Sequence, residues 1–138
     1  MPFADIVGQE LAVSCLERSL GRGRIAHAYL FAGPEGVGKE EAALVLAQAL
    51  NCPAASPAPC GSCSTCRRIE DGLYPDVQRV APAGNNIKID QIRTLQQEAY
   101  FRPLEGRRKV FIITEAHRMT EEAANSFLRL LEEPPPYA

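Results

Sequence analysis

The chain of 138 residues lacks three features that would set it apart from ordinary globular proteins. It has no run near the ~18 consecutive apolar residues of a membrane-spanning helix. Its first residues lack the basic and then apolar layout of a signal peptide. It also lacks a strong charge of either sign, since its formal net charge is −2. We therefore expect a cytoplasmic protein without membrane contact, and not a free-standing basic nucleic-acid binder. DNA contact through a local basic patch in a larger assembly stays open.

What is present is the composition and patterning of an α/β domain. Hydrophobic residues make up 46% of the chain and charged residues 23%, which suits one domain with a real core. Apolar spacing predicts helices near residues 11–20, 42–50, 92–99 and 124–131, and short apolar runs predict strands over residues 28–31, 77–80 and 110–113. Strands that alternate with helices of this length favour a parallel sheet.

The segment from Gly33 to Lys39 matches the G-x-x-x-x-G-K pattern of a phosphate-binding loop. Its glycines let backbone N–H groups turn toward phosphate oxygens, while Lys39 and the start of the next helix add positive charge. A glycine turn without a ligand is the alternative. Lys39 argues against it, because a lysine is unfavourable at a helix start unless an anion lies there. The predicted nucleotide-binding residues are Gly33, Pro34, Glu35, Gly36, Val37, Gly38, Lys39 and Glu40.

The groups that hold Mg²⁺ in such sites have changed type. Glu40 stands where a Ser or Thr hydroxyl is expected, and Thr114 stands where an Asp is expected after the strand over 110–113. The two side chains differ in length from the usual pair, which disfavours octahedral Mg²⁺ coordination. Glu115 is the candidate general base if the site is active. We expect weak or absent ATP hydrolysis, although ATP or ADP binding stays open.

Four cysteines lie within fifteen residues, at Cys52, Cys60, Cys63 and Cys66. Four thiolates are what a closed tetrahedral Zn²⁺ site needs, and the surrounding Pro and Gly residues could not build a core by themselves. An iron–sulfur cluster and ordinary buried or reactive thiols are the alternatives. The sequence therefore predicts a structural zinc site in an insertion over residues 52–66, with neither helix nor strand within it.

Several of these segments together resemble one family. They are Ile6–Gln9, His27–Pro34, the four-cysteine insertion that directly follows the phosphate-loop helix, and Ala124–Pro135. The chain resembles the clamp-loader subunits of bacterial DNA polymerase III, which belong to the AAA+ group. Glu40 and Thr114 make it more similar to the delta-prime type than to the ATP-hydrolysing gamma/tau type.

The resemblance implies a RecA-like P-loop fold with three layers around a parallel sheet, and it adds Val7 to the nucleotide-binding residues. It also implies a non-hydrolysing rigid subunit of the polymerase holoenzyme, with the other loader subunits, the sliding clamp and primed DNA as partners. Residues 1–138 would form a truncated N-terminal AAA+ domain without lid and collar domains. Its sheet would lack a central strand, which predicts marginal stability.

Two other functions stay open at this point. The first is an ATP-hydrolysing motor subunit of the gamma/tau type. The second is a zinc-dependent nucleic-acid-binding module that uses the cysteines and the basic run Arg107–Lys109. Against this second function, the same run has the ordinary interpretation of a solvated strand entry.

Overall fold

The computed structural model describes residues 10–23, 25–34, 38–53 and 59–138. The chain divides into two compact units, Met1–Tyr74 and Pro75–Ala138. Each unit has a hydrophobic core of its own.

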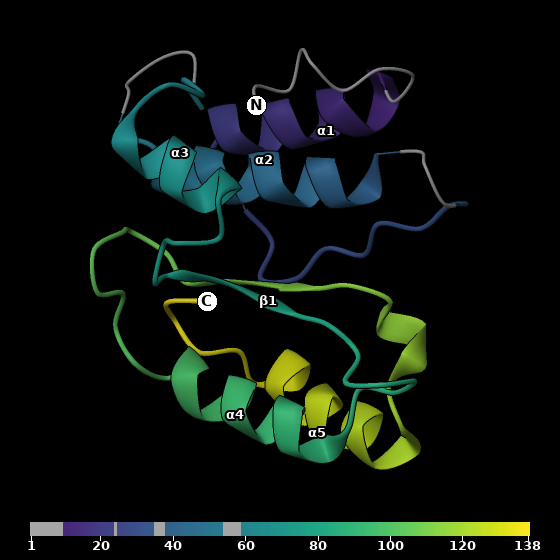
Figure 1. The fold of residues 1–138 in the computed structure, drawn as a ribbon. Coiled ribbons are helices and arrows are strands. Elements are labelled where there is room, and N and C mark those ends of the chain that lie inside the picture. Colours follow the sequence, from purple (N-terminus) through teal and green to yellow (C-terminus); the bar gives the residue numbers. More distant parts are fainter. Residues whose placement is uncertain (1–9, 24, 35–37, 54–58) are drawn as a thin grey trace. The chain divides into compact units, whose positions relative to one another are not determined.

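The first unit is helical in its described part. Its helices are α1 (Glu10–Gly21), α2 (Lys39–Asn51) and α3 (Ser64–Glu70). The first two lie alongside each other (Figure 1) and share a core in which Leu16 of α1 packs with Val45, Leu46 and Ala49 of α2. These positions follow the apolar spacing of the sequence, and α1 ends at Gly21 as predicted.

The expected strand over residues 28–31 is wrong. This segment has no regular secondary structure, and Leu30 within it is 85% exposed. Phe31 packs instead against the cluster around Leu16. A strand exists only through hydrogen bonds to a neighbouring strand, and the sheet in the described residues contains two strands, both from the other unit. Apolar composition predicted the burial of Phe31 but could not supply a pairing partner.

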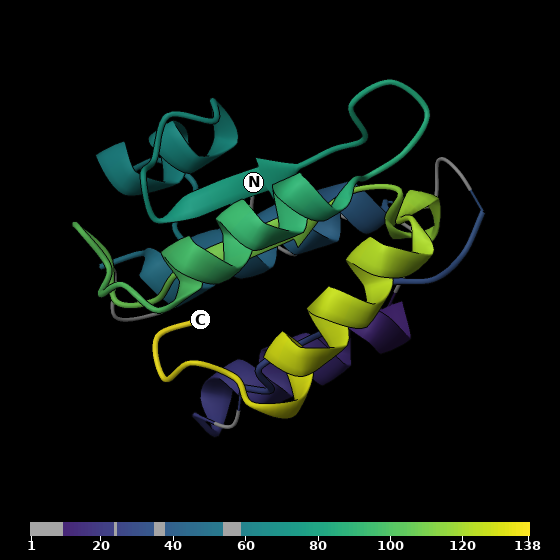
Figure 2. The same cartoon turned by 90° about the horizontal axis from the view of Figure 1, so that it is seen from below.

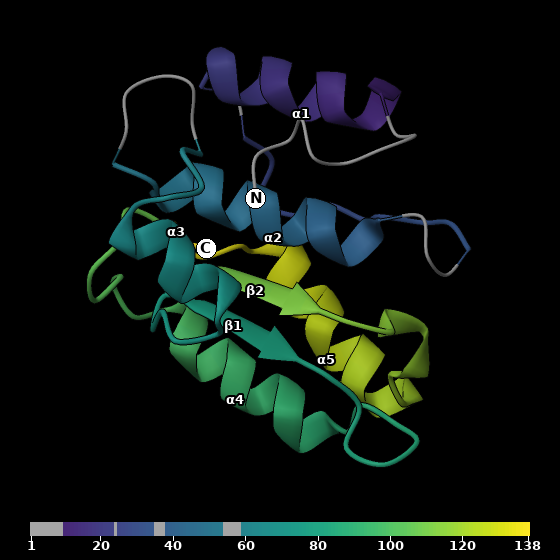
Figure 3. The same cartoon turned by 45° about the horizontal axis from the view of Figure 1, so that its top comes forward.

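The second unit contains the sheet. Its elements are β1 (Val77–Val80), α4 (Ile89–Ala99), β2 (Val110–Ile113), the 3₁₀ turn η2 (Ala116–Arg118) and α5 (Glu121–Glu132). The strands run parallel, with Val77 opposite Val110 and Val80 opposite Ile113, and Figure 3 shows their arrows pointing the same way. The parallel α/β class predicted from the sequence is therefore confirmed for this unit.

Helices α4 and α5 cover the same face of this sheet (Figure 1) and lie side by side when seen from below (Figure 2). Their shared core is formed by Ile87, Ile92 and Ala123, against which Val80, Ile113, Met119 and Phe127 pack. A hydrogen bond of 2.7 Å from Gln96 Nε2 to the Ser126 carbonyl oxygen joins the two helices. Thr120 caps α5, because its Oγ1 accepts the Ala123 N–H at 3.2 Å.

Within the described residues, every helix falls short of the length and apolar character that crossing a membrane requires.

Candidate functional site

The four clustered cysteines come together in the first unit, as the sequence predicted. Their Sγ atoms all lie within 4.8 Å of one another. Cys52 follows the last residue of α2, Cys60 and Cys63 precede α3, and Cys66 lies in its first turn. All four are free thiols, and the Sγ atoms are 3.9 Å apart for Cys52 and Cys63 and 4.0 Å apart for Cys60 and Cys66.

These distances fit a single tetrahedral metal ion. Four sulfurs at the Zn–S distance of about 2.3 Å form a tetrahedron with edges of about 3.8 Å, close to the two Sγ–Sγ distances of 3.9 and 4.0 Å. Four sulfurs within 4.8 Å leave no room for a cluster of several irons between them. The donor set and its spacing therefore agree with a closed mononuclear site and disagree with an iron–sulfur cluster.

Backbone N–H groups already point at the sulfurs. The Cys60 N–H donates to Cys52 Sγ at 3.5 Å, the Cys63 N–H to Cys60 Sγ at 3.2 Å, and the Cys66 N–H to Cys63 Sγ at 3.4 Å. Such donors favour the thiolate form, which is the form that binds a metal. The short segment thus holds its ligands in place through its own main chain.

The cysteines differ in how easily they ionise. Backbone hydrogen bonds from Ser62 and Cys63 lower the pKa of Cys60 to about 6. Burial raises the pKa of the Cys66 thiol to about 12, since this side chain is fully buried. This pair of cysteines suits a bound cation. The cation would supply the positive charge that the buried Cys66 sulfur needs in order to be a thiolate beside the Cys60 thiolate.

The expectation that residues 52–66 contain no helix is wrong at its end. Helix α3 begins at Ser64, with Cys63 as its N-cap residue and the Cys63 sulfur accepting the Cys66 N–H. A signal was present, because Cys66 and Ile69 are spaced by three residues and both are buried. The fifth cysteine, Cys15, lies on the apolar face of the predicted helix over residues 11–20, which favours a place in the core, yet it is exposed.

Gln48 is a residue of this site that the sequence did not reveal. It lies in a buried stretch of α2 and is itself fully buried. Its side-chain Nε2 donates to the main-chain carbonyl oxygen of Cys66 at 2.9 Å. The main-chain carbonyl oxygen of Gln48 accepts the Cys52 N–H at 2.7 Å. One residue thus contacts the main chain of two of the four thiol ligands.

The predicted phosphate-binding loop is described only at its two ends. Gly38 is the N-cap of α2 with φ 93°, a left-handed conformation that favours glycine. Lys39 opens the helix, and its Nζ donates to the Gly33 carbonyl oxygen at 2.7 Å. The lysine therefore draws the ends of the loop together. The remaining predicted positions Val7, Glu35, Gly36 and Val37 lie outside the described residues.

Glu40 lies in the exposed first turn of α2, beside Glu41. Negative side chains there interact favourably with the positive end of the helix dipole. This arrangement is stable without a ligand, and it places carboxylates close to where phosphates would bind. The role of Glu40 in nucleotide binding therefore stays a prediction.

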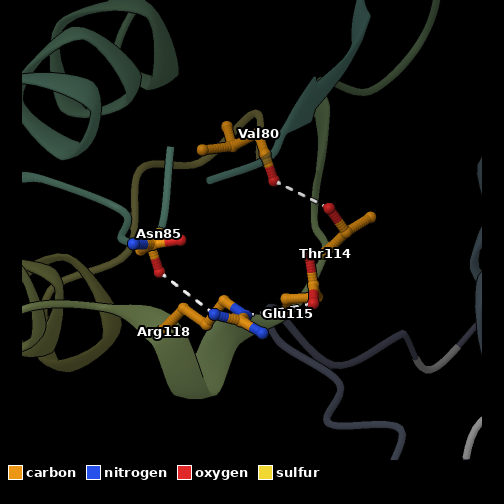
Figure 4. Close-up of polar contacts among 5 residues, drawn as sticks. All are labelled: Val80, Asn85, Thr114, Glu115 and Arg118. Atoms are coloured by element: carbon orange, nitrogen blue, oxygen red, sulfur yellow. Dashed lines mark hydrogen bonds and ion pairs between the residues drawn. The ribbon is translucent and has the colours of Figure 1, made fainter. Parts of the chain in front are cut away.

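The second pair of predicted site residues lies where β2 ends (Figure 4). Thr114 donates from Oγ1 to the Val80 carbonyl oxygen at 3.4 Å. Glu115 has φ 50°, unusual for a residue other than glycine, and its Oε1 accepts from Arg118 Nε at 3.1 Å. Arg118 Nη1 also donates to the Asn85 carbonyl oxygen at 3.3 Å. The Glu115 carboxylate therefore takes part in a network that ties the exit of β2 to the turn after β1.

The basic run before β2 is solvated at Arg107, which is exposed, but not at Lys109, where the predicted solvated strand entry is wrong. Lys109 is only 8% exposed, and its Nζ donates to the Glu98 carbonyl oxygen at 2.7 Å and lies 5.7 Å from the centre of the Phe101 ring. One of the three cations of the run Arg107–Lys109 is thus used inside the fold. This weakens the alternative of a nucleic-acid module built on that run.

The described residues combine a short parallel α/β unit with a four-thiol cluster at the end of the helix that follows the glycine-rich segment. Residues 8–138 match the family described as DNA polymerase III, delta subunit, and the chain belongs to that family. The expected resemblance to DNA polymerase III subunits is confirmed.

Two named relatives agree with this assignment. The chain is 45% identical over 126 residues to DNA polymerase III subunit delta' of Bacillus subtilis, covering 91% of this chain and 38% of that protein. It is 43% identical over 134 residues to DNA polymerase III subunit tau of Escherichia coli, covering 96% of this chain and 21% of that protein. A solved structure of a DNA polymerase III gamma subunit-related protein from Thermotoga maritima shares 39% identity, with a TM-score of 0.44, covering 51% of this chain and 26% of that one. The chain thus spans well under half the length of these relatives.

Proposed function

We propose that this chain forms the nucleotide-binding-like domain of a clamp-loader subunit of the delta-prime type. In this proposal it is a rigid, non-hydrolysing member of a hetero-oligomeric ring in the bacterial cytoplasm, and it helps to place the sliding clamp on primed DNA. Membership of the DNA polymerase III delta family supports the replication role. The observation that carries the non-hydrolysing role is the replacement of both usual Mg²⁺ ligands, by Glu40 and Thr114.

The contacts of Thr114 and Glu115 support weak or absent hydrolysis. The Thr114 hydroxyl donates to the Val80 carbonyl oxygen, and the Glu115 carboxylate pairs with Arg118. A general base has to reach the attacking water with a free lone pair and a suitable geometry. In this structure Oε1 of the Glu115 carboxylate accepts from Arg118 Nε at 3.1 Å, and this ion pair competes with such a role.

Nucleotide binding without turnover is part of the proposal. The N-terminus of α2 and the Lys39 ammonium are the groups that would hold phosphate oxygens of ATP or ADP. Lys39 now donates to the Gly33 carbonyl oxygen at 2.7 Å, and a phosphate would offer it a charged acceptor in exchange. The glycine-rich loop between these two residues was predicted from sequence for the same purpose.

The four cysteines hold a structural Zn²⁺ in this proposal. Bound there, the ion supplies a permanent cross-link between the end of α2 and the start of α3, and it serves no catalytic step. The sulfur spacing, the backbone N–H donors and the buried Cys66 support this assignment. Metal analysis of the purified protein should give one zinc per chain.

Turnover of ATP by the purified full-length protein tests the proposed role. We expect the wild type to hydrolyse ATP no faster than Lys39→Ala, while ATP titration detects binding with little dependence on Mg²⁺. The double variant Glu40→Thr/Thr114→Asp restores the usual ligand types and should make ATP binding depend on Mg²⁺. Wild-type turnover that Lys39→Ala abolishes would instead identify a gamma/tau-type motor.

The nucleic-acid module is tested separately. It requires DNA binding by the isolated protein that weakens steeply with salt and disappears when zinc is removed. We expect no such binding, since Lys109 is buried and bonded inside the fold.

A further inference from the structure

We propose that Gln48 is a positioning residue of the metal centre: through one side chain it fixes the distance between the cysteine carried by α2 and those carried by the α3 segment. This inference rests on the proposed structural zinc site and adds to it a residue outside the ligand set.

The four ligands reach the centre from two separate pieces of chain. Cys52 is attached to the end of α2, whereas Cys60, Cys63 and Cys66 follow one another at intervals of three residues. The second group is held together by its own N–H to sulfur bonds at 3.2 and 3.4 Å. Toward α2, the Cys60 N–H donates to Cys52 Sγ at the longer distance of 3.5 Å, which fixes less tightly where the group lies relative to that helix.

Gln48 spans the two pieces. Its Nε2 donates to the Cys66 carbonyl oxygen across 18 residues of sequence, at 2.9 Å. From the same residue, the main-chain oxygen accepts the N–H of Cys52 at 2.7 Å. A shift of α3 along α2 would therefore break the Gln48 bond and move the Cys66 sulfur relative to the Cys52 sulfur.

The burial of Gln48 shows why a carboxamide at this place has a specific role. The side chain is fully buried and lies between buried apolar residues from Leu44 to Ala49. An amide costs free energy in such surroundings unless its groups are bonded. An apolar residue would fit the pattern of this helix face better, so packing alone does not explain the glutamine. The hydrogen bond from its side chain to the main chain of the thiol ligand Cys66 does explain it.

Outer residues that orient metal ligands usually change metal affinity by about ten- to a hundredfold when they are replaced. Gln48→Met keeps the length and shape of the side chain and removes the N–H donor. We expect this variant of the full-length protein to bind zinc about ten- to a hundredfold more weakly in competition with a chromophoric chelator. With Co²⁺ as the probe, we expect weaker or shifted visible bands, because those bands report the tetrahedral geometry of the four sulfurs.

The matched control is Gln96→Met in the second unit. Gln96 also donates from Nε2 to a main-chain carbonyl oxygen on a neighbouring helix, at 2.7 Å, but it contacts no cysteine. We expect it to lower the melting temperature and to leave the zinc affinity and the Co²⁺ bands unchanged. Equal effects of both variants on zinc affinity would assign the loss to general destabilisation and overturn the proposal.

Two further outcomes separate this inference from the proposed function. If Gln48→Met binds zinc as tightly as the wild type and gives the same Co²⁺ spectrum, the positioning role is wrong and the zinc site stands. If the wild type itself binds no zinc, the proposed site is wrong, and the inference falls with it. Should Gln48→Met fail to fold, Gln48→Asn decides by the same measurements, because its shorter amide cannot span the bond to Cys66.

Discussion

Each unit of this chain orders an irregular segment with side-chain acceptors for main-chain N–H groups, but the acceptors are cysteine sulfurs in the first unit and a carboxylate in the second. In the first unit, sulfur atoms of Cys52, Cys60 and Cys63 accept backbone N–H groups around the sharp turns before α3. In the second unit, the buried carboxylate of Asp76 accepts three backbone N–H groups from the segment before β2. In both, an acidic side chain satisfies main-chain donors that no helix or strand could satisfy.

The difference lies in how burial affects the two ionisable side chains Asp76 and Cys66. Asp76 is an anion at neutral pH by itself, and the N–H groups of Leu104, Glu105 and Gly106 at 2.6 to 2.8 Å, together with nearby Lys109, keep it so. Burial raises the pKa of the Cys66 thiol to about 12, and a bound metal ion would favour its thiolate form. The first unit should therefore respond to chelators and the second to acid.

Removal of the metal should have the largest effect, and it should be confined to the first unit. Binding of structural zinc contributes on the order of 10 kcal/mol in comparable peptides, so its loss exceeds the stability of a small unit. We expect a strong chelator, or Cys66→Ala, to remove hydrogen-exchange protection from α2 and α3. Protection of β1, β2, α4 and α5 should persist.

This result would show that the two units unfold independently of each other. Hydrogen exchange read by mass spectrometry on the full-length protein gives both halves in one measurement. Cys15→Ala is the matched control, because Cys15 is exposed and lies outside the four-thiol cluster. Protection lost equally in both units would show that they fold as one, and protection kept in both would show that the thiols hold no stabilising metal.

Replacement of Asp76 should have the next largest effect, this time in the second unit. Asp76→Ala leaves three main-chain donors without an acceptor and Lys109 without its nearby carboxylate. We expect a loss of about 3–5 kcal/mol in the free energy of unfolding, measured by urea denaturation. Asp90→Ala is the control, since Asp90 is 90% exposed and its ion pair with Arg93, at 3.6 Å, is exposed as well. It should change stability by at most about 0.5 kcal/mol.

Acid should affect the second unit through the same carboxylate. Burial alone raises the pKa of Asp76, but hydrogen bonds from the Gly106, Glu105 and Leu104 N–H groups and the charge of Lys109 outweigh it and lower the pKa below its ordinary value. A lowered pKa means that the folded unit binds this proton less readily than the unfolded chain does. The stabilisation is therefore complete above about pH 4, the ordinary value for Asp, and is lost as the pH falls through the folded pKa.

The pH dependence can be measured by urea denaturation between pH 6 and pH 2, followed through hydrogen exchange of β1 and β2. Asp76→Asn cannot ionise, so its stability should fall less steeply below pH 4 than that of the wild type. An unchanged slope in Asp76→Asn would mean that other carboxylates cause the acid sensitivity of this unit.

The sequence predicted local elements well and long-range pairing poorly. Apolar periodicity located the helices and both strands of the second unit, because those patterns reflect burial on one side of each element. It failed for residues 28–31, where an apolar run alone cannot show whether a neighbouring strand is present. It also missed helix α3 altogether, because the cysteines concealed a helical spacing that Ile69 continues.

The candidate site shows the same limit. The spacing of the four cysteines was sufficient to predict that they meet, since metal ligands recur at short intervals. Nothing in the sequence marked Gln48 or Asp76, because their partners are 18 and about 30 residues away. A polar residue in a buried position becomes informative only when its acceptor or donor is known. Lys109 is the same case, since its bond to the Glu98 carbonyl oxygen could not be read from a basic run.

The smallest expected effect concerns how helices start in the two units. Helix α2 begins after Gly38 without a side-chain cap, whereas α5 begins after Thr120, whose Oγ1 accepts the Ala123 N–H at 3.2 Å. Thr120→Ala removes that acceptor and should destabilise the second unit by about 1 kcal/mol.

Thr94→Ala is the matched control: Thr94 lies inside α4 and donates to the Asp90 carbonyl oxygen of its own helix. Alanine suits a helix interior, so Thr94→Ala should be neutral or slightly stabilising. If both variants lower the urea midpoint equally, the threonine hydroxyl at position 120 is not a cap, and the start of α5 depends on packing of its apolar face alone.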